Sequence, residues 1–293
     1  MKSLFKNGQI FWFIGFFIGD GYTTYGRVGI DTTTPKFAEV IVDQLTQLTD
    51  KPVKFEIYGD HKKFRAILTR SFLHYPKKRE DWSDYVKIRI DSENFRRKFS
   101  QFIQKTYEKI EELPKEYQLK FLQGFFDAEG TVSPDGTVQV DLAKDNFNLK
   151  LAKKISTLLS RFKIKNKLRE KRRRISLIIE GRSAHITNLE LFQELIGFSS
   201  PIKRRDLEIV IDVYSSSKDN RPHFWVEREI LKVLQSRSSI ELKELMWILR
   251  IKYDKLKVCL NRLMRKKLVR KVVLHKRVWL ELTPSSVPIG KQD

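Results

Sequence analysis

A short phrase that occurs twice constrains this chain more than any other feature. The first copy, 15–21, reads Gly-Phe-Phe-Ile-Gly-Asp-Gly, and the second, 124–130, reads Gly-Phe-Phe-Asp-Ala-Glu-Gly. Each copy places an acid just before its last glycine, Asp20 in the first and Glu129 in the second. Because internal repeats mark repeated structural units, the sequence predicts two related halves and not one continuous unit.

Each copy of the phrase ends an apolar stretch of helical length, 10–18 and 119–128. Residues four positions apart share one face of a helix, and a face of small residues lets a second backbone come close. We therefore predict that the two helices pack against each other, with Gly21 and Gly130 ending them in the left-handed conformation. The small residues of the two faces are Gly15 and Gly19, then Gly124 and Ala128.

This packing would bring Asp20 and Glu129 together at two helix C-termini, where the macrodipole is already negative. Two carboxylates in that position repel each other unless a cation lies between them. A hard, oxygen-seeking ion such as Mg²⁺ or Mn²⁺ suits two carboxylates. The phrases therefore predict a divalent-metal site, with the backbone carbonyls of Gly19 and Ala128 as additional oxygen ligands.

The two phrases resemble the paired motifs of the LAGLIDADG homing endonucleases, in the single-chain form that carries two motifs. The resemblance implies an α+β fold in which two pseudo-symmetric αββαββα halves form a saddle of antiparallel sheets over DNA. It also implies cleavage of both strands of a long specific duplex site by a monomer. Phosphodiester hydrolysis would use metal ions held by Asp20 and Glu129 as catalytic carboxylates.

Two other interpretations of the first phrase are a pair of core helices with incidental acids and a secretory signal. Lys2 and Lys6 before the apolar run 10–18 are typical of a signal. The recurrence of the phrase and the lack of an Ala-x-Ala cleavage site argue against a signal. The run is also too short to span a bilayer.

The charge of the chain indicates a polyanionic partner. The formal net charge is +22 and the pI is about 9.9. We find no lipid anchor or membrane-length run, so nucleic acid is favoured over a membrane. The single cysteine, Cys259, excludes an internal disulfide and a cysteine zinc cluster, which predicts an intracellular, cytoplasmic protein, with an organelle also compatible.

The periodicity of the chain predicts three units: a first half at 1–112, a second at 113–218 and a third unit at 223–283, after a polar linker at 215–222. In the first half we predict strands at 25–32, 53–58, 64–68 and 85–90, helices at 36–48 and 93–107, and a loop at 74–84. In the second half a helix begins near Pro114, strands follow at 136–142, 166–169 and 174–180, and helices at 146–162, 183–196 and 201–217.

Alternation along these strands predicts that each sheet keeps one open face, which could lie in a DNA major groove. A merely solvated face is the alternative. The predicted DNA-binding residues are Arg27, Lys54, Arg65, Lys87 and Arg89 in the first half, and Gln139, Lys167, Arg169, Arg172 and Arg174 in the second.

The third unit reads as three helices, at 224–235, 239–249 and 253–267, followed by a hairpin at 268–274 and 277–282. Ser239 is the predicted N-cap of the second helix. This order resembles a winged helix-turn-helix domain, which implies DNA contacts by Lys257 and Arg262 on the third helix and by Lys276 and Arg277 on the hairpin. Residues 223–293 hold 17 lysines and arginines against 7 acids, which favours DNA over the alternative, a protein-docking role.

The family resemblance also implies a lysine near each metal site, at the end of the strand that follows the motif helix. Lys144 fits in the second half, whereas the first half has Thr33 at the matching place. This difference predicts unequal cleavage of the two strands. The alternative is that Lys144 is a solvated side chain beside a helix N-cap, Asp145.

Three functions are compatible with these features. The first is a site-specific, metal-dependent DNA endonuclease of the homing type. The second is a regulator that binds DNA on the same scaffold without cleaving it, although both acids are present here. The third is a maturase that acts in RNA splicing.

Overall fold

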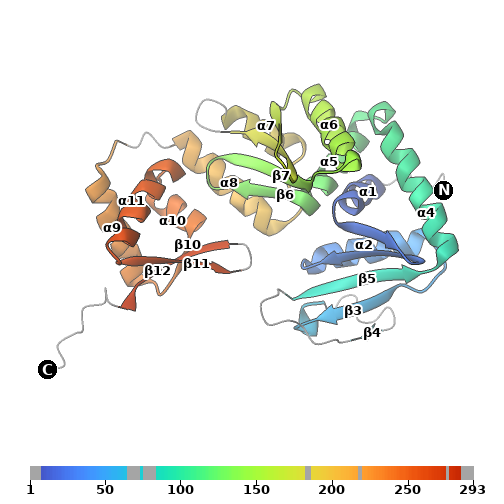
Figure 1. Ribbon diagram of the computed structural model, residues 1–293, viewed down its shortest axis with the longest axis horizontal. Coiled ribbons are helices and arrows are strands. Elements are labelled where there is room, and N and C mark those ends of the chain that lie inside the picture. The colour runs from blue at the N-terminus through green and yellow to red at the C-terminus, as the bar shows by residue number, and fades with distance from the viewer. Residues whose placement is uncertain are drawn as a thin grey trace.

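The computed structural model describes residues 8–64, 73–74, 84–181, 186–216, 220–274 and 277–284. The chain has an α+β fold with three sheets, and Figure 1 shows the two halves side by side with the third unit at one end. All strand pairs in the described residues are antiparallel except β3 with β4. None of the helices in these ranges has the length and hydrophobicity required to cross a membrane.

The first half is a sheet in the order β1-β2-β5-β3-β4 with helices packed on one side. Val28, Ile30, Ile88 and Ile90 are fully buried toward the helices. The elements are α1 (Gln9–Asp20), β1 (Gly21–Thr24), β2 (Arg27–Thr32), α2 (Pro35–Leu48), β3 (Lys54–Tyr58), β4 (Leu73–His74), β5 (Tyr85–Asp91) and α4 (Glu93–Lys109).

The second half repeats this order of strands as β6-β7-β9-β8. After the last strand the halves differ, because the first continues into one long helix, α4, and the second into two, α7 and α8. The elements are α5 (Lys115–Glu129), β6 (Gly130–Ser133), β7 (Thr137–Ala143), α6 (Asn146–Arg161), β8 (Asn166–Glu170), β9 (Arg174–Glu180), α7 (Ile186–Leu195) and α8 (Pro201–Ser216).

The predicted contact between the two motif helices is confirmed. A Cβ added to Gly15 would lie 2.0 Å from the backbone oxygen of Phe121, and one added to Gly124 would lie 1.9 Å from that of Trp12. Contacts this short mean that only glycine fits at either position. The small faces therefore set the distance between α1 and α5, and the aromatic residues around them fill the core on both sides.

The predicted left-handed ends of these helices are wrong. Gly21 has φ −83° and Gly130 has φ −70°, both in the extended region. Each glycine is the first residue of a strand, so the chain passes directly from helix to strand and needs no left-handed turn. Glycine is required for space instead, because a Cβ would lie 2.4 Å from the Phe17 oxygen at Gly21 and 2.5 Å from the Phe126 oxygen at Gly130.

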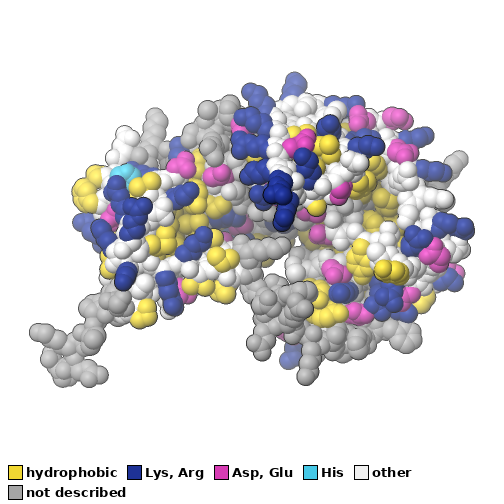
Figure 2. Space-filling model, in the orientation of Figure 1, with side chains coloured by type: hydrophobic (Ala, Val, Ile, Leu, Met, Phe, Trp, Pro, Cys, Tyr) yellow, Lys and Arg dark blue, Asp and Glu magenta, His cyan; other side chains and the backbone are white. Residues whose placement is uncertain are grey.

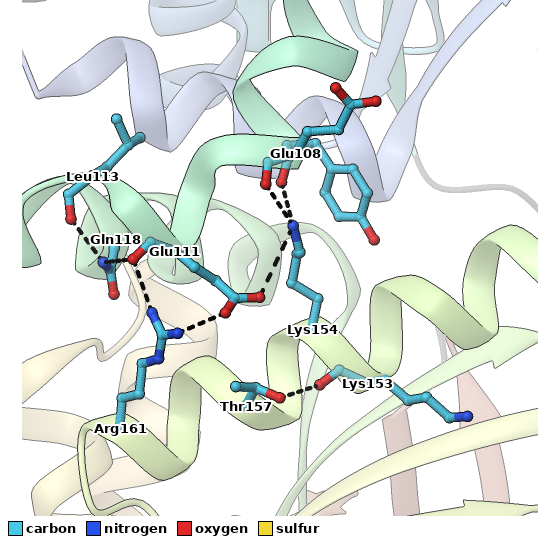
Figure 3. Close-up of polar contacts among 9 residues, drawn as sticks. Glu108, Glu111, Leu113, Gln118, Lys153, Lys154, Thr157 and Arg161 are labelled. Carbon is cyan, nitrogen blue, oxygen red and sulfur yellow. Dashed lines mark hydrogen bonds and ion pairs between the residues drawn. The ribbon is translucent and has the colours of Figure 1, made fainter.

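Hydrogen bonds and an ion pair from two basic residues of α6 hold the linker between the halves (Figure 3). The linker contains a short 3-10 helix, η3 (Ile110–Glu112). Lys154 donates to the carbonyls of Tyr107 and Glu108, both at 2.9 Å, at the C-terminal end of α4. Arg161 donates to the Glu111 carbonyl at 2.8 Å and pairs with its carboxylate at 2.7 Å. These bonds hold the end of the first half against the second.

The third unit packs on α8 through charged side chains. Its elements are α9 (His223–Ser236), β10 (Ile240–Glu241), α10 (Leu242–Leu249), α11 (Tyr253–Arg265), β11 (Val269–Leu274) and β12 (Arg277–Leu282), with the sheet order β10-β12-β11. The predicted N-cap Ser239 is wrong, because Ile240 and Glu241 pair with β12 and α10 begins only at Leu242. The helices and hairpin agree with the prediction, while assignment as a winged helix stays a prediction.

Two smaller predictions also differ from the structure. The strand predicted at 25–32 begins only at Arg27, because Tyr25 and Gly26, both with positive φ, form the turn between β1 and β2. In the strand predicted at 64–68, Phe64 belongs to a 3-10 helix, η2 (His61–Phe64), and 65–68 lie outside the described residues. β4 lies at the start of the predicted loop, of which 75–83 lie outside the description.

Candidate functional site

The acids of the two motifs line one cleft. Asp20 and Glu129 both contribute to a cleft of about 850 Å³, which also contains Asp31 and Asp141 from the two central hairpins. The third unit forms one wall with Glu241, Leu242, Lys243, Arg277 and Val278. The cleft therefore gathers residues from all three units around the C-terminal ends of α1 and α5.

The close approach of the helix ends explains why the acids meet. A Cβ on Gly19 would lie 2.6 Å from the Ala128 Cβ and 3.0 Å from the Glu129 Cγ, so Gly19 packs directly against the second motif. Asp20 follows Gly19 as the last residue of α1, and Glu129 is the last residue of α5. Both carboxylates thus lie where the helix dipoles are negative, an arrangement that favours a bound cation.

Asp31 adds a third carboxyl to this negative region. Burial raises the pKa of Asp31, and although Lys87 opposes the rise, Glu56 and Asp20 add to it. Its Oδ1 is buried without a hydrogen-bond partner among the described residues. The electrostatic effect of Asp20 on Asp31 means that the negative charge of the cleft extends from the end of α1 onto β2.

These residues fit a Mg²⁺ or Mn²⁺ ion. No three acidic, histidine or cysteine side chains in the described ranges are grouped as a complete protein cage. Mg²⁺ needs no such cage, because it is commonly bound by one or two carboxylates, water and substrate phosphates. Asp20 and Glu129 supply the two carboxylates, and the orphaned Asp31 Oδ1 is an oxygen acceptor in the same cleft.

Lys203 is a cleft lysine that the sequence interpretation missed. It lies in the first turn of α8, and its Nζ donates to the carbonyls of Asp127 at 2.6 Å and Ala128 at 3.1 Å. The ammonium thus lies at the negative end of α5, bonded to the carbonyls of the two residues that precede Glu129. Lys203 also lines the cleft. Its bond to Ala128 occupies one lone pair of a carbonyl predicted as a metal ligand.

Lys144 lies elsewhere. It follows β7, and its Nζ is 3.2 Å from the Glu170 carboxylate on β8. It is not one of the residues that line the cleft, whereas Thr33, its predicted counterpart, is. The fold therefore brings Asp20, Glu129, Gly19 and Ala128 together and leaves Lys144 outside the cleft.

The basic residues predicted on the first open face are paired with acids of the same face. Arg27 and Lys54 bind the Asp91 carboxylate at 3.2 and 2.8 Å, and Arg89 pairs with Glu56. The Lys87 ammonium lies 5.2 Å from the centre of the Tyr58 ring. Arg65 lies outside the described residues. Strand register explains the pairing, because Arg27 lies directly opposite Asp91. Lys54 lies opposite Arg89 and Glu56 opposite Lys87, which places Lys54 diagonal to Asp91 and Glu56 diagonal to Arg89.

The second open face carries basic residues that are paired with acids and others that are exposed. Arg174 binds Asp141 at 3.1 Å, Gln139 donates to Asp141 at 2.8 Å, and Lys167 binds Glu180 at 2.8 Å. Arg169 on edge strand β8 and Arg172 in the β8–β9 turn are exposed. The central strand departs from the predicted alternation, because Ile175 to Ile179 are all buried.

The predicted contacts of the third unit are divided between exposed and buried positions. Lys257 is exposed on α11, and Arg262 is 3.6 Å from Glu227. Arg277 is partly buried and bonds Asp206 of α8 at 3.0 Å and Glu241, so it ties the unit to the second half. Lys276 lies outside the described residues. Figure 2 shows lysine and arginine side chains across the visible surface of the third unit and the second half.

Comparison with known proteins finds a family model that matches part of the chain. Residues 116–197 match the LAGLIDADG-like domain family. A segment of 99 residues is 38% identical to a probable translation initiation factor IF-2 of Thermococcus kodakarensis, and it spans 33% of this chain but 8% of that factor.

Among solved structures, the chain resembles I-DmoI in complex with DNA and Mn, with 16% identity, a TM-score of 0.44, and coverage of 66% of this chain and 97% of that one. It also resembles the N-terminal LAGLIDADG domain of DUF199/WhiA, with 18% identity, a TM-score of 0.43, and coverage of 68% and 85%.

Proposed function

We propose that the protein is a metal-dependent endonuclease of the homing type that cleaves both strands of a specific site in duplex DNA. The observation that carries the proposal is that Asp20 and Glu129, from opposite helices of the α1–α5 pair, line one cleft. The LAGLIDADG-like match, which includes Glu129, supports it. The net charge of +22 supports a nucleic-acid partner.

The residues divide the work of hydrolysis as follows. Asp20 and Glu129 would hold the divalent metal, with the carbonyls of Gly19 and Ala128 as further oxygen donors. A metal held there would supply activation of water and stabilisation of the leaving oxygen. We assign the role of cleft lysine to Lys203 in place of Lys144, because a fixed positive charge here stabilises the charge that develops on the phosphate.

DNA binding is proposed for the two open faces and the third unit. Arg169, Arg172 and Lys257 are exposed and can reach phosphates directly. Arg27, Lys54, Arg89 and Arg174 must exchange an acid for a phosphate, so each contributes less net affinity than an unpaired cation. The first sheet and the second sheet would each contact one half of a long site, with the protein acting as a monomer.

The test begins with a library of duplexes that carry a randomised region, incubated with the protein and Mg²⁺. We expect a defined set of sequences to be cut, and EDTA to abolish cutting. Asp20→Asn and Glu129→Gln should still shift the selected duplex in a gel but cleave it at least about 100-fold more slowly. Binding without cutting by the wild type would indicate a regulator, and a preference for RNA in competition would indicate a maturase.

A further inference from the structure

The second motif contains a buried carboxylate that the first motif lacks. Asp127 is 3% exposed, and the matching position of the first phrase is Ile18. Its Oδ2 accepts from the Trp12 indole at 2.8 Å, which connects α5 to α1. A buried carboxylate is costly unless its oxygens are hydrogen-bonded, so its presence calls for a local reason.

That reason lies at the start of α8. Asp127 Oδ1 accepts from the backbone amides of Ser199 at 2.9 Å and Ser200 at 3.2 Å, the two residues before the helix. The carbonyl of the same Asp127 accepts from Lys203 Nζ at 2.6 Å. Asp127 therefore holds α8 at two points, the backbone that leads into it and the lysine of its first turn.

We propose that Asp127 is a positioning residue of the second half-site: its carboxylate fixes the first turn of α8 and thereby keeps the Lys203 ammonium at the end of α5. The proposal rests on the proposed endonuclease function for its catalytic consequence. In the first half the chain continues from β5 into α4, and the described residues between α4 and α5 hold only the short η3 and no counterpart of α8, so this arrangement is found in one half. The cleavage rates of the two DNA strands would therefore depend differently on Asp127.

The first measurement does not depend on cleavage. Competitive labelling of lysine amines, followed by peptide mass spectrometry, reports how strongly Lys203 is held in the metal-free protein. Both Asp127 carboxylate oxygens accept N–H groups, Oδ1 from Ser199 and Ser200 and Oδ2 from Trp12 and Ser199. In Asp127→Asn a donor NH2 replaces one of these acceptors in either orientation, so the Ser199–Ser200 backbone should move and Lys203 labelling should rise severalfold. Asn188→Ala is the matched control, since Asn188 is also a buried polar residue of the second half and bonds Lys165 and Glu180 at a distance from the cleft.

The second measurement follows each strand of the selected duplex separately. Asp127→Asn and Lys203→Met should slow the same strand by about 10- to 100-fold, and the double variant should be no slower than Lys203→Met alone. Affinity for the duplex should stay within about twofold. Asn188→Ala should lower stability without a difference between strands.

Two results would overturn the proposal: unchanged Lys203 labelling in folded Asp127→Asn, or equal slowing of both strands. If Asp127→Asn does not fold, Asp127→Glu replaces it, because the longer carboxylate must displace the Ser199–Ser200 backbone, and the same rise in labelling is expected. A wild type that cuts no duplex would refute the endonuclease function, while the labelling result would still decide whether Asp127 holds Lys203.

Discussion

Asp31 carries a charge that is unfavourable in the folded chain. Burial raises its pKa above the ordinary 3.8, so the folded state binds a proton more tightly than the unfolded state. The stability of the fold therefore falls as pH rises through 3.8 toward the raised pKa, and the ionised carboxylate carries a constant cost above it. We expect Asp31→Asn to be more stable than the wild type at pH 7, with the difference disappearing below about pH 3.8 in denaturant unfolding.

Asp91 lies on the same face of the sheet and is a control, because its pKa shifts in the opposite direction to that of Asp31. Burial acts to raise its pKa, but the hydrogen bond from Lys54 and the charges of Arg89 and Arg27 outweigh it and lower the pKa. Its contribution is present above pH 3.8 and is lost as pH falls through the lowered pKa. Asp91→Asn should therefore be less stable than the wild type at pH 7. The same sign for both variants would contradict this account of the face.

Individual site residues could be predicted only where the sequence itself repeats. The repeated phrase identified Asp20, Glu129, Gly19 and Ala128, and the fold brings all four together. Lys203 could not be found in this way, because it reaches the site from a helix far along the chain and no second copy marks it. Arg277 and Lys54 are of a residue type that commonly contacts DNA, but each is paired with an acid. Arg277 binds Asp206 because the third unit packs on α8, and Lys54 binds Asp91 because of the strand register.

At the scale of elements, the close contact between α1 and α5 joins the two halves. Gly15→Ala places a Cβ 2.0 Å from a backbone oxygen that cannot move without shifting α5. We expect its free energy of unfolding to fall by about 2 kcal/mol or more, despite the better helix propensity of alanine. Chemical denaturation measures this directly.

Gly8→Ala is the control for that prediction. Its Cβ would lie 3.6 Å from the Lys120 Cγ, an ordinary contact, at the start of the same helix. The change in stability should stay below about 1 kcal/mol. An equal loss in both variants would mean that the glycine faces do not set the distance between the helices.

Most helices and strands followed from periodicity, and the misses have physical causes. Gly21–Thr24 and Gly130–Ser133 were missed as strands because each is short and follows a helix with no intervening turn residue. The sequence predicts a helix at Ile240–Glu241, where the structure has a strand, because the pairing partner, β12, lies about 40 residues later.

At the scale of the whole molecule, Asp206 holds the third unit against α8. It is 7% exposed and binds Lys243 at 2.7 Å and Arg277 at 3.0 Å. Removing Asp206 takes the carboxylate away from the Lys243 ammonium, whose side chain is 13% exposed, and leaves Arg277 with Glu241. Removing one partner of a buried ion pair costs about 3 kcal/mol or more. Asp206→Ala should therefore split thermal unfolding into two transitions, with the third unit melting first, as calorimetry would show.

A surface ion pair within the third unit is the control for Asp206. Arg270 and Glu281 are 2.7 Å apart, and the arginine is more than half exposed. Glu281→Gln should cost less than about 1 kcal/mol and leave a single transition. If Asp206→Ala also melts in one unshifted transition, the third unit is not anchored by this cluster.

The arrangement of the three units was the part of the fold that the sequence could not give. Composition predicted a third, basic unit, but the cleft wall that it forms depends on where α10 and β12 dock on α8. The resulting cleft of about 850 Å³ is in the size range of a small-ligand pocket. Duplex DNA that reaches the motif acids must therefore displace the third unit or use it as part of the binding surface.

The central claim is that Asp20 and Glu129 form the metal-dependent centre for cleavage of duplex DNA. Single-turnover cleavage of the library-selected duplex, followed on each strand with Mg²⁺ and with EDTA, tests it most directly. The account predicts Mg²⁺-dependent cutting by the wild type and a loss of at least about 100-fold in Asp20→Asn and in Glu129→Gln, with DNA affinity retained. Cutting by either variant at the wild-type rate would contradict it.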